Sequence, residues 1–228
     1  MRRLADACKA VGLTIGLATM MACSASAAEA DVFTHPKTAD DLAKNLLAQP
    51  AKDIARTQVL RGRFLHRKYL SDIPAPLEAA GEFIFVRQRG LYWHTLRPFD
   101  SVFVLTPNAM SQQDEGGKAM KLDAASQPAI RAAAGIFMAL FAVDLKALDK
   151  DFQMFGQPGA KDGQWLLGLR PKNSALTAVF TEAIISGAAQ VRQVELRDGH
   201  GDRTVIELQD TELSGRAPTQ QELALTAN

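Results

Sequence analysis

Hydrophobic and polar residues alternate along much of the chain from residue 58 onward, and this pattern predicts β-strands. Successive side chains of a strand point to opposite faces of a sheet, so a period of two is typical of a half-buried strand. Glycine, proline and charged residues separate the alternating segments, which indicates turns between antiparallel strands. We predict strands at 59–70, 81–87, 91–96, 101–106, 118–122, 151–155, 164–170, 190–197 and 203–208.

The same period predicts which residues share a face of the sheet. One predicted apolar face consists of Phe83, Phe85, Leu91, Trp93, Val102 and Val104. Ile84 and Val86 make the strand 81–87 apolar on its other face as well. A sheet that is apolar on both faces needs cover on both, from helices or from a ligand.

Three segments between these strands have other patterns. Residues 107–117 (PNAMSQQDEGG) are rich in turn formers and predict a loop. The glycine-rich segment 198–202 (DGHGD) predicts a hairpin turn. Residues 175–186 are open to two interpretations, because their composition favours a helix whereas their alternation favours a strand that ends at Gly187. We favour the strand.

A first helix is predicted to begin at Thr38. Its hydroxyl is suited to cap a helix, and Asp40 and Asp41 follow in the first turn. The apolar face of this helix consists of Leu42, Leu46 and Leu47. Pro50 is expected to lie beyond its end.

A second helix is predicted to begin at Pro128. Its segment 136–143 (IFMALFAV) contains almost no polar residue and is too short to cross a membrane. A helix that is apolar nearly all round must be buried, or must face apolar groups on two sides.

The N-terminal segment has the pattern of a signal peptide. Basic residues come first, the uncharged apolar stretch 10–22 follows, and Ala25 and Ala27 fit the small-residue cleavage rule. We therefore expect a signal peptide over 1–27, and a single exported domain over 28–228. The alternative is a tethered N-terminal helix.

Both cysteines, Cys8 and Cys23, lie in the segment that we expect to be removed. Cleavage after Ala27 would leave a domain with no disulfide, no thiol nucleophile and no cysteine metal site. Lipidation of Cys23 is the alternative and would anchor the protein to a membrane. We consider it less well supported, because Met20 stands three residues before Cys23, where a leucine or valine is usual.

Composition and charge narrow the function classes. Hydrophobic residues make up 47% of the 228, which is enough for a large core and an apolar cavity. The formal net charge is +1, and the chain has no long basic run. We therefore expect no nucleic-acid partner.

The sequence contains no recognisable catalytic or cofactor-binding motif, and we expect no enzyme activity, no cofactor and no metal site. The four histidines, His35, His66, His94 and His200, are widely separated, and we interpret each as a surface or strand residue. Carboxylates brought together by folding could still perform acid–base chemistry, so a hydrolase remains an alternative.

Residues 81–98 resemble the LolA family, the periplasmic carriers of outer-membrane lipoproteins. The family has here a strand with glycine and alternating apolar residues, an Arg-Pro pair, a short turn and an aromatic strand with tryptophan. The matching segment is Gly81-Glu-Phe83-Ile-Phe85-Val-Arg87-Gln88-Arg89-Gly90-Leu91-Tyr92-Trp93, followed by Pro98. The order of signal peptide, helix, strands, apolar helix and closing strands is also similar to that of the family.

This resemblance implies an α+β fold that is mainly β: a curved antiparallel sheet forming an open half-barrel, with helices as a lid over an apolar cavity. It also implies an arginine that holds the lid shut, and Arg87 matches that residue by its spacing from Gly81 and Trp93. The chain departs from the family where Gln88 replaces a proline and where a second arginine, Arg89, follows.

The implied function is a periplasmic carrier that takes a lipoprotein, or another acyl-bearing lipid, from an inner-membrane release complex to an outer-membrane acceptor. We expect a monomer. The alternative is a lipid-anchored LolB-like acceptor or an envelope lipid sensor with the same fold. The predicted acyl cavity is lined by Phe64, Phe83, Phe85, Leu91, Trp93, Phe103, Ile136, Phe137, Leu140 and Phe141. The aromatic residues among them would fit core packing equally well.

Overall fold

The computed structural model describes residues 32–123, 138, 141, 144–178 and 180–227. The predicted signal peptide 1–27 with Cys23, most of the predicted helix from Pro128, and the predicted cavity residues Ile136, Phe137 and Leu140 lie outside the described residues.

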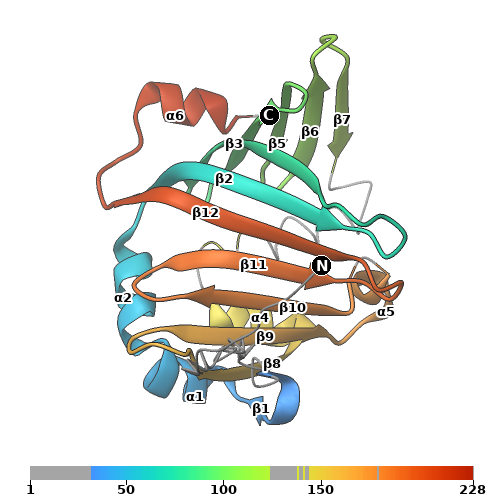
Figure 1. Ribbon diagram of the computed structural model, residues 1–228. Coiled ribbons are helices and arrows are strands. Elements are labelled where there is room, and N and C mark those ends of the chain that lie inside the picture. The colour runs from blue at the N-terminus through green and yellow to red at the C-terminus, as the bar shows by residue number, and fades with distance from the viewer. Residues whose placement is uncertain (1–31, 124–137, 139–140, 142–143, 179, 228) are drawn as a thin grey trace, which may run out of the picture. The chain divides into compact units, whose positions relative to one another are not determined.

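The described strands form one antiparallel sheet that is curved and not closed (Figure 1). Its order is β1-β8-β9-β10-β11-β12-β2-β3-β4-β5-β6-β7, so β1 and β7 are the two edges. The strands are β1 Pro36–Lys37, β2 Val59–Tyr69, β3 Leu77–Val86, β4 Gly90–Arg97, β5 Ser101–Leu105, β6 Ala109–Asp114, β7 Ala119–Asp123, β8 Phe152–Pro158, β9 Trp165–Pro171, β10 Glu182–Gly187, β11 Val191–Arg197 and β12 Arg203–Ser214. The predicted mainly-β fold with a curved antiparallel sheet is confirmed.

Pairing between β2 and β12 joins the two halves of the sheet. Strands β2 to β7 are each paired with the next strand along the chain, and so are β8 to β12. The long strand β12 then returns to pair with β2, from Arg203 opposite Tyr69 to Ser214 opposite Val59. This pairing makes one continuous sheet from segments far apart in the sequence.

Short helical segments accompany the sheet. They are η1 Val32–Thr34, α1 Ala39–Asp41, η2 Leu42–Leu46, α2 Ala48–Arg56, α4 Leu145–Asp151, α5 Ser174–Thr177 and α6 Gln220–Leu225. Thr38 caps α1 as predicted, since its hydroxyl accepts a hydrogen bond from the Asp41 N–H. Pro50 lies beyond the helical segment that Thr38 begins, as expected, although it lies within a further helix that was not predicted. A kink at Leu47 starts the new helix α2, and Pro50 lies in its first turn, where a missing N–H costs no helical hydrogen bond.

The segment 107–117 is not the loop that its composition suggested, because it contains strand β6. Its backbone is paired on both sides, by β5 and by β7. The segment 175–186 is divided between the two interpretations: α5 is helical, and β10 is the strand. The turn 198–202 connects β11 to β12, as predicted.

The hydrophobic core lies on one face of the sheet, called here the inner face. Cross-strand register brings Phe83 opposite Trp93, and Trp93 opposite Phe103. Buried residues of the strands and helices form one cluster with them, which includes Leu47, Leu60, Phe64, Phe85, Leu91, Leu105, Leu148, Phe152, Met154, Leu167, Leu169, Ile185 and Leu208. The inner face therefore continues across the sheet from β8 to β5.

The prediction that Val102 and Val104 share a face with Trp93 is wrong. They lie opposite His94 and Tyr92, and therefore point to the other face of the sheet. Phe103 and Leu105 take the inner positions instead. In the segment SVFVL both odd and even positions are apolar, so the alternation alone could not show which side chains point to the inner face.

Gly81 is required by a close approach between strands. It lies opposite Phe64 on β2, next to an irregularity in the pairing of β3 with β4. A Cβ atom at this position would lie 1.9 Å from the carbonyl oxygen of His94 and 2.9 Å from the ring of Phe64. With no side chain at Gly81, the ring of Phe64 extends across β3 and stacks on Trp93.

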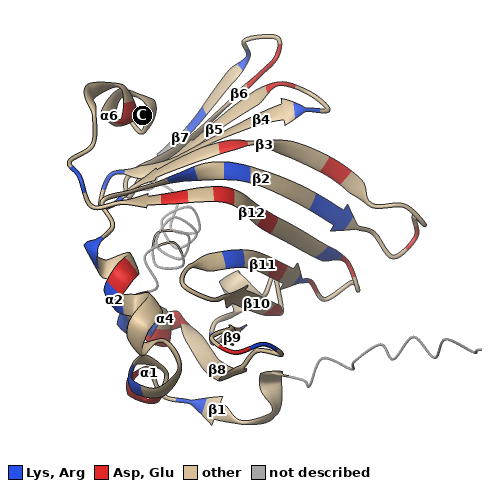
Figure 2. Cartoon of the chain, turned by 60° about the vertical axis from the view of Figure 1, so that its left-hand side comes forward, with Lys and Arg blue, Asp and Glu red and all other residues tan. Residues whose placement is uncertain are grey.

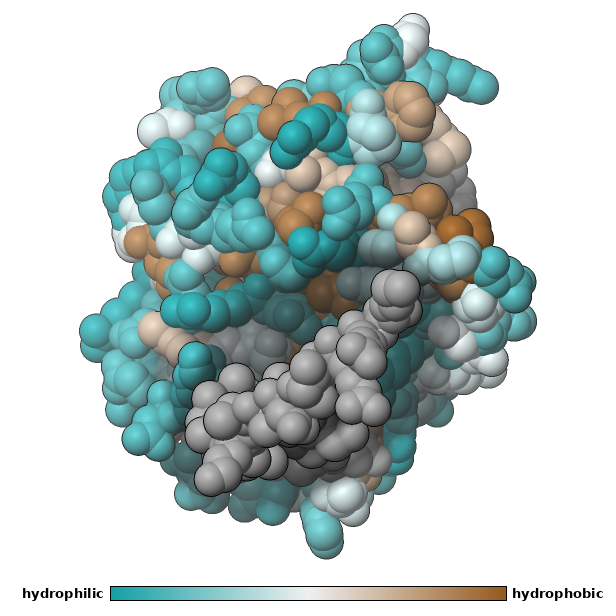
Figure 3. Space-filling view, in the orientation of Figure 1, coloured by the Kyte–Doolittle hydropathy of each residue, from teal (hydrophilic) through white to brown (hydrophobic). Residues whose placement is uncertain are grey.

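The other face of the sheet, the outer face, carries charged residues in cross-strand pairs, and Figure 2 shows basic and acidic positions on the neighbouring strands β2, β3 and β12. Pairs across neighbouring strands are Arg61–Glu212, Arg67–Glu207, Arg67–Glu78, Arg170–Glu182, Arg197–Glu182 and Arg203–Glu195. Most of these side chains are exposed, so each pair contributes roughly 0.2–1 kcal/mol at most. Hydrophilic residues also predominate in the space-filling view, with smaller hydrophobic patches among them (Figure 3).

A small second cluster covers part of the outer face. Val32 and Phe33 of η1 pack on Phe155 of β8, and the Phe33 and Phe155 rings meet edge to face at 5.2 Å. The guanidinium of Arg170 lies 4.6 Å from the centre of the Phe33 ring. On β8, therefore, the apolar outer residue Phe155 is covered by a segment of the chain itself.

Helix α6 in the polar C-terminal tail has an N-terminal capping box. Thr219 accepts from the Glu222 N–H, and the Glu222 carboxylate accepts from the Thr219 N–H. Arg216 donates to both carboxylate oxygens, at 2.7 and 2.6 Å. The bonds from Arg216, with those from Thr219, lower the pKa of Glu222 from 4.5 to about 2, although burial opposes the shift.

We predict that Glu222→Gln lowers stability at neutral pH but not in strong acid. Because the pKa is lowered in the folded chain, the ionised carboxylate stabilises fully above pH 4.5, and this contribution is lost as the pH falls towards 2. The variant should lose on the order of 2 kcal/mol at pH 7. Urea unfolding of both proteins at several pH values measures this. An equal difference at pH 7 and pH 2.5 would contradict the assignment.

Candidate functional site

A row of aromatic side chains lies along the inner face. Phe64 stacks on Trp93 with ring centres 3.8 Å apart and planes at 22°. Trp93 is followed by Phe83 at 5.9 Å, Phe83 by Phe141 at 5.8 Å, and Phe141 by Phe85 at 5.3 Å. Aromatic rings present a large apolar area with little conformational freedom, so the row is a stiff apolar wall.

The structure brings together the described members of the predicted cavity. Phe64, Phe83, Phe85 and Leu91 are buried. Trp93, Phe103 and Phe141 are partly buried and pack on the same cluster. Further inner-face residues, among them Leu60 and Leu105, were absent from the predicted set although both follow the period of two.

Phe141 occupies the space beside Phe85 where an acyl chain is expected. Its ring stacks nearly parallel on Phe85, at 20°. The cavity next to it has a volume of about 20 Å³, enough for one water molecule. Pockets that enclose small-molecule ligands are roughly 300–1,000 Å³. In this arrangement, therefore, an acyl chain could enter beside Phe85 only if Phe141 or a neighbouring side chain moved.

Arg87, the predicted latch, lies at the end of β3 and binds the C-terminal end of α2. Its Nε donates to the carbonyl oxygen of Thr57 at 2.7 Å, and its Nη2 donates to the carbonyl oxygen of Ile54. Thr57 is the C-cap residue of α2, and the Ile54 carbonyl, in the last turn, also accepts from the Thr57 N–H. The C-terminal end of a helix carries a partial negative charge. A cation fixed there stabilises the helix end and ties α2 to the sheet.

The turn after Arg87 explains why the family proline is missing. Gln88 has a φ of +59°, in the left-handed region. Proline is restricted to a φ near −65°, so it could not adopt this conformation. The side chain of Arg89 is exposed, and no ion pair or side-chain hydrogen bond is found for it among the described residues. Of the two arginines, Arg87 is the one that contacts a helix.

A larger groove of about 720 Å³ lies elsewhere, against α6 and the turn between β5 and β6. Its lining includes the cations Arg89 and Lys121 together with Gln88 and Asn108. This mixed polar lining does not suit a hydrocarbon chain. The aromatic row, which is apolar throughout, is the better candidate for an acyl site.

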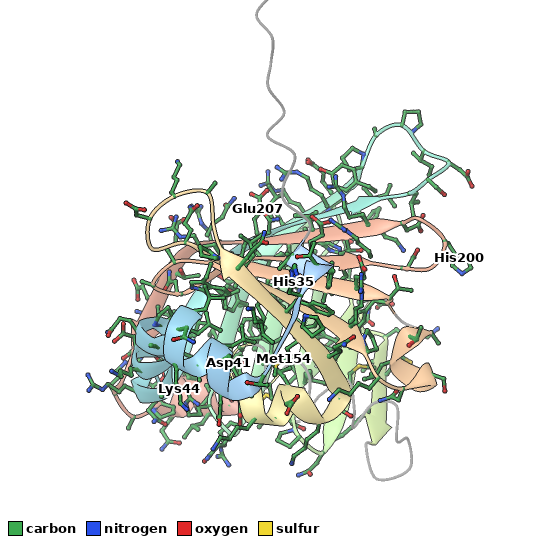
Figure 4. All side chains as sticks on the ribbon, turned by 90° about the horizontal axis from the view of Figure 1, so that it is seen from below. His35, Asp41, Lys44, Met154, His200 and Glu207 are labelled. Atoms are coloured by element: carbon green, nitrogen blue, oxygen red, sulfur yellow. The ribbon has the colours of Figure 1, made fainter. Side chains whose placement is uncertain are left out.

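The histidines do not form a shared site. Figure 4 shows His200 at the tip of the β11–β12 turn and His35 beside β1. His94 lies on the outer face, with its Nε2 3.0 Å from Asp100. Within the described ranges, no group of three or more His, Cys, Asp or Glu side chains is placed to hold a metal ion. None of the described helices is long and apolar enough to span a membrane.

Sequence reasoning missed one polar residue of the inner face, His66. It lies on β2 at the same parity as Phe64 and opposite Ile206 of β12. Burial, and to a lesser extent the charge of Lys68, lower the pKa of His66. The alternation in the sequence places His66 and Phe64 on one face, but only the register shows that this is the inner face.

Residues 34–227 match the family model described as "Outer membrane lipoprotein carrier protein LolA-like". This match covers nearly all of the described part of the chain. No curated protein sequence matches the chain significantly.

Solved structures with similar folds have low sequence identity to this chain. A putative outer membrane lipoprotein-sorting protein domain from Vibrio parahaemolyticus is 8% identical, with a TM-score of 0.41 over 79% of this chain and 98% of the other. A LolA superfamily protein from Nitrosomonas europaea is 9% identical, with a TM-score of 0.40 over 80% and 96%. A DUF1329 family protein from Desulfovibrio piger is 11% identical, with a TM-score of 0.40 over 74% and 90%. Scores this low carry no functional conclusion, and the assignment rests on the family match.

We predict that Arg87→Leu destabilises the protein by roughly 1.5–3 kcal/mol, because two hydrogen bonds from a charged group to carbonyl oxygens are lost. Arg89→Leu is the matched control, since it removes the same charge from an exposed side chain in the same turn. The control should change stability by no more than about 0.5 kcal/mol. Urea unfolding measures both, and equal losses would show that Arg87 does not secure α2.

Proposed function

The chain belongs to the family of LolA-like outer membrane lipoprotein carrier proteins, and we propose that it binds the acyl chains of a lipoprotein, or of a related lipid, against the aromatic row of its inner face. It would carry this cargo through the periplasm from the inner to the outer membrane. The family is one of carriers and is not known to include enzymes.

The aromatic row is the observation that carries this proposal. Five rings from β2, β3, β4 and the segment of Phe141 follow one another at 3.8–5.9 Å along a face with few polar groups. Each methylene group transferred from water to such a surface contributes about 0.8 kcal/mol. An acyl chain of roughly sixteen carbons would therefore bind strongly, even after the cost of displacing Phe141.

Release requires that the protein's own closed and open arrangements differ little in free energy, so that a partner can shift the population from one to the other. Phe141 supports such an exchange, because its contacts with Phe83 and Phe85 are the kind that an acyl chain would replace. Arg87 also supports this exchange. Its two hydrogen bonds with the end of α2 hold in place the residues that line one side of the small cavity beside Phe85. In this proposal Arg87 holds the empty site shut, and cargo binding displaces the side chains around Phe141.

The proposed carrier acts as a monomer, accepting cargo from an inner-membrane release complex and delivering it to an outer-membrane acceptor. The paired charges on its outer face support diffusion through water. The apolar face that could receive cargo is then the inner one.

We predict that a diazirine amino acid at position 85 captures acylated molecules in cells after irradiation, whereas the same residue at position 84 does not. Phe85 and Ile84 are neighbours on β3 and point to opposite faces, opposite Leu91 and Tyr92 respectively. Mass spectrometry of the cross-linked protein identifies the adducts. Absence of acylated adducts at position 85, or equal capture at both positions, would contradict the proposed site.

A further inference from the structure

His66 is a polar residue in the lining of the apolar inner face. On β2 it comes two residues after Phe64, and its direct cross-strand neighbours are Ala79 of β3 and Ile206 of β12. Both neighbours are apolar, and Ala79 is small. The imidazole therefore stands beside the aromatic row, next to a small residue of the flanking strand β3.

The Nε2 atom of His66 is buried and has no hydrogen-bond partner, and it is the one such side-chain atom found in the part of the chain that the structure describes. An unpaired buried polar atom loses its hydrogen bonds to water without replacement, so such atoms are rare in folded proteins and call for an explanation. The outer-face His94 shows the usual arrangement, since it lies between Asp100 and Glu82.

The ring of His66 is suited to a neutral partner. Its pKa is lowered by burial and by Lys68, so the imidazole is uncharged near pH 7. A neutral imidazole has one N–H donor and one acceptor nitrogen, and the tautomer with hydrogen on Nε2 donates to a carbonyl oxygen. Lys68, two residues further along β2, would disfavour a cationic ligand group at this place.

The inner face of β2 changes character along its length. Leu60 and Phe64 are buried and apolar, His66 follows, and Lys68 is the next residue of the same parity. On β12 the paired positions change in the same direction, from Leu208 opposite Phe64 to Thr204 opposite Lys68, whereas Leu77 of β3 lies on the other side of Lys68. His66 thus lies where the apolar surface gives way to polar residues, as the linkage of a lipid lies between its hydrocarbon chain and its polar part.

We infer that His66 Nε2 donates a hydrogen bond to the carbonyl oxygen that joins an acyl chain to the rest of its lipid, in an ester or an amide. The hydrocarbon chain would then extend from His66 along Phe64 and Trp93 towards Phe85. The polar part of the lipid would lie near Lys68. This inference rests on the proposed acyl-binding function and adds to it the chemical group recognised and the direction of the chain.

Two probes of equal chain length separate the carbonyl from the hydrocarbon. 1-Palmitoylglycerol has an ester carbonyl, and 1-O-hexadecylglycerol has an ether in its place. Titration calorimetry below the micelle concentration measures the affinity of each for the delipidated protein. Wild type should bind the ester about 2- to 10-fold more tightly than the ether, the effect of one neutral hydrogen bond. In His66→Phe this preference should fall to about 1, with the ether bound as tightly as by wild type or more tightly.

Two further variants keep the result interpretable. His94→Phe makes the same replacement on the outer face and should retain the ester preference. His66→Gln keeps an N–H donor and should retain part of it, which covers the case in which His66→Phe does not fold. Binding of both probes with no ester preference in wild type, or a preference that persists in both His66 variants at wild-type strength, would overturn the role of His66 but not the carrier function. Binding of neither probe to wild type would overturn both.

Discussion

The structure depends on an apolar inner face that a curved, unclosed sheet cannot cover by itself. In a closed barrel the strands surround their own interior, whereas here β1 and β7 remain separate edges. The inner surface from β8 to β5 must therefore be removed from water by other groups. Within the described chain, side chains of η2, α2 and α4 and Phe141 contribute to that cover. A surface covered by separate segments can exchange part of its cover for a ligand.

Two kinds of contact hold the part of this cover that the structure describes. Arg87 ties α2 to β3 through two carbonyl oxygens, and the contact of Phe141 with the sheet consists of ring packing. Apolar packing is non-directional, so a hydrocarbon chain can replace it at little cost, whereas a directed hydrogen bond must be broken at a defined place. The apolar contacts would therefore accept many different acyl chains, whereas the hydrogen bonds of Arg87 define a single closed arrangement of the site. The unpaired nitrogen of His66 would then provide the one directed contact with cargo.

Much of the sheet could be predicted from the period of two, because most strands have one buried and one exposed face. Strand β6 escaped prediction, since its sequence AMSQQD has few apolar residues and it is held by backbone pairing with β5 and β7. Which side chains of β5 point to the inner face could not be predicted, because Val102, Phe103 and Val104 are all apolar and only the strand register decides it. Helix α6 did leave a sequence signal, the capping pair Thr219 and Glu222. The family resemblance indicated that Arg87 binds the helical lid, but not which residues it contacts. That α2 lies against the end of β3 depends on the tertiary fold.

The central claim, that the inner face holds an acyl chain, is tested most directly by native mass spectrometry of the protein purified from its own cells without detergent. The account predicts a population whose mass exceeds that of the chain by one acylated molecule. This population should be lost in Phe85→Glu, which introduces a charge at the buried end of the aromatic row, and retained in Ile84→Glu on the outer face. Only the unliganded mass in wild type, or the same bound molecule in Phe85→Glu, would contradict the claim.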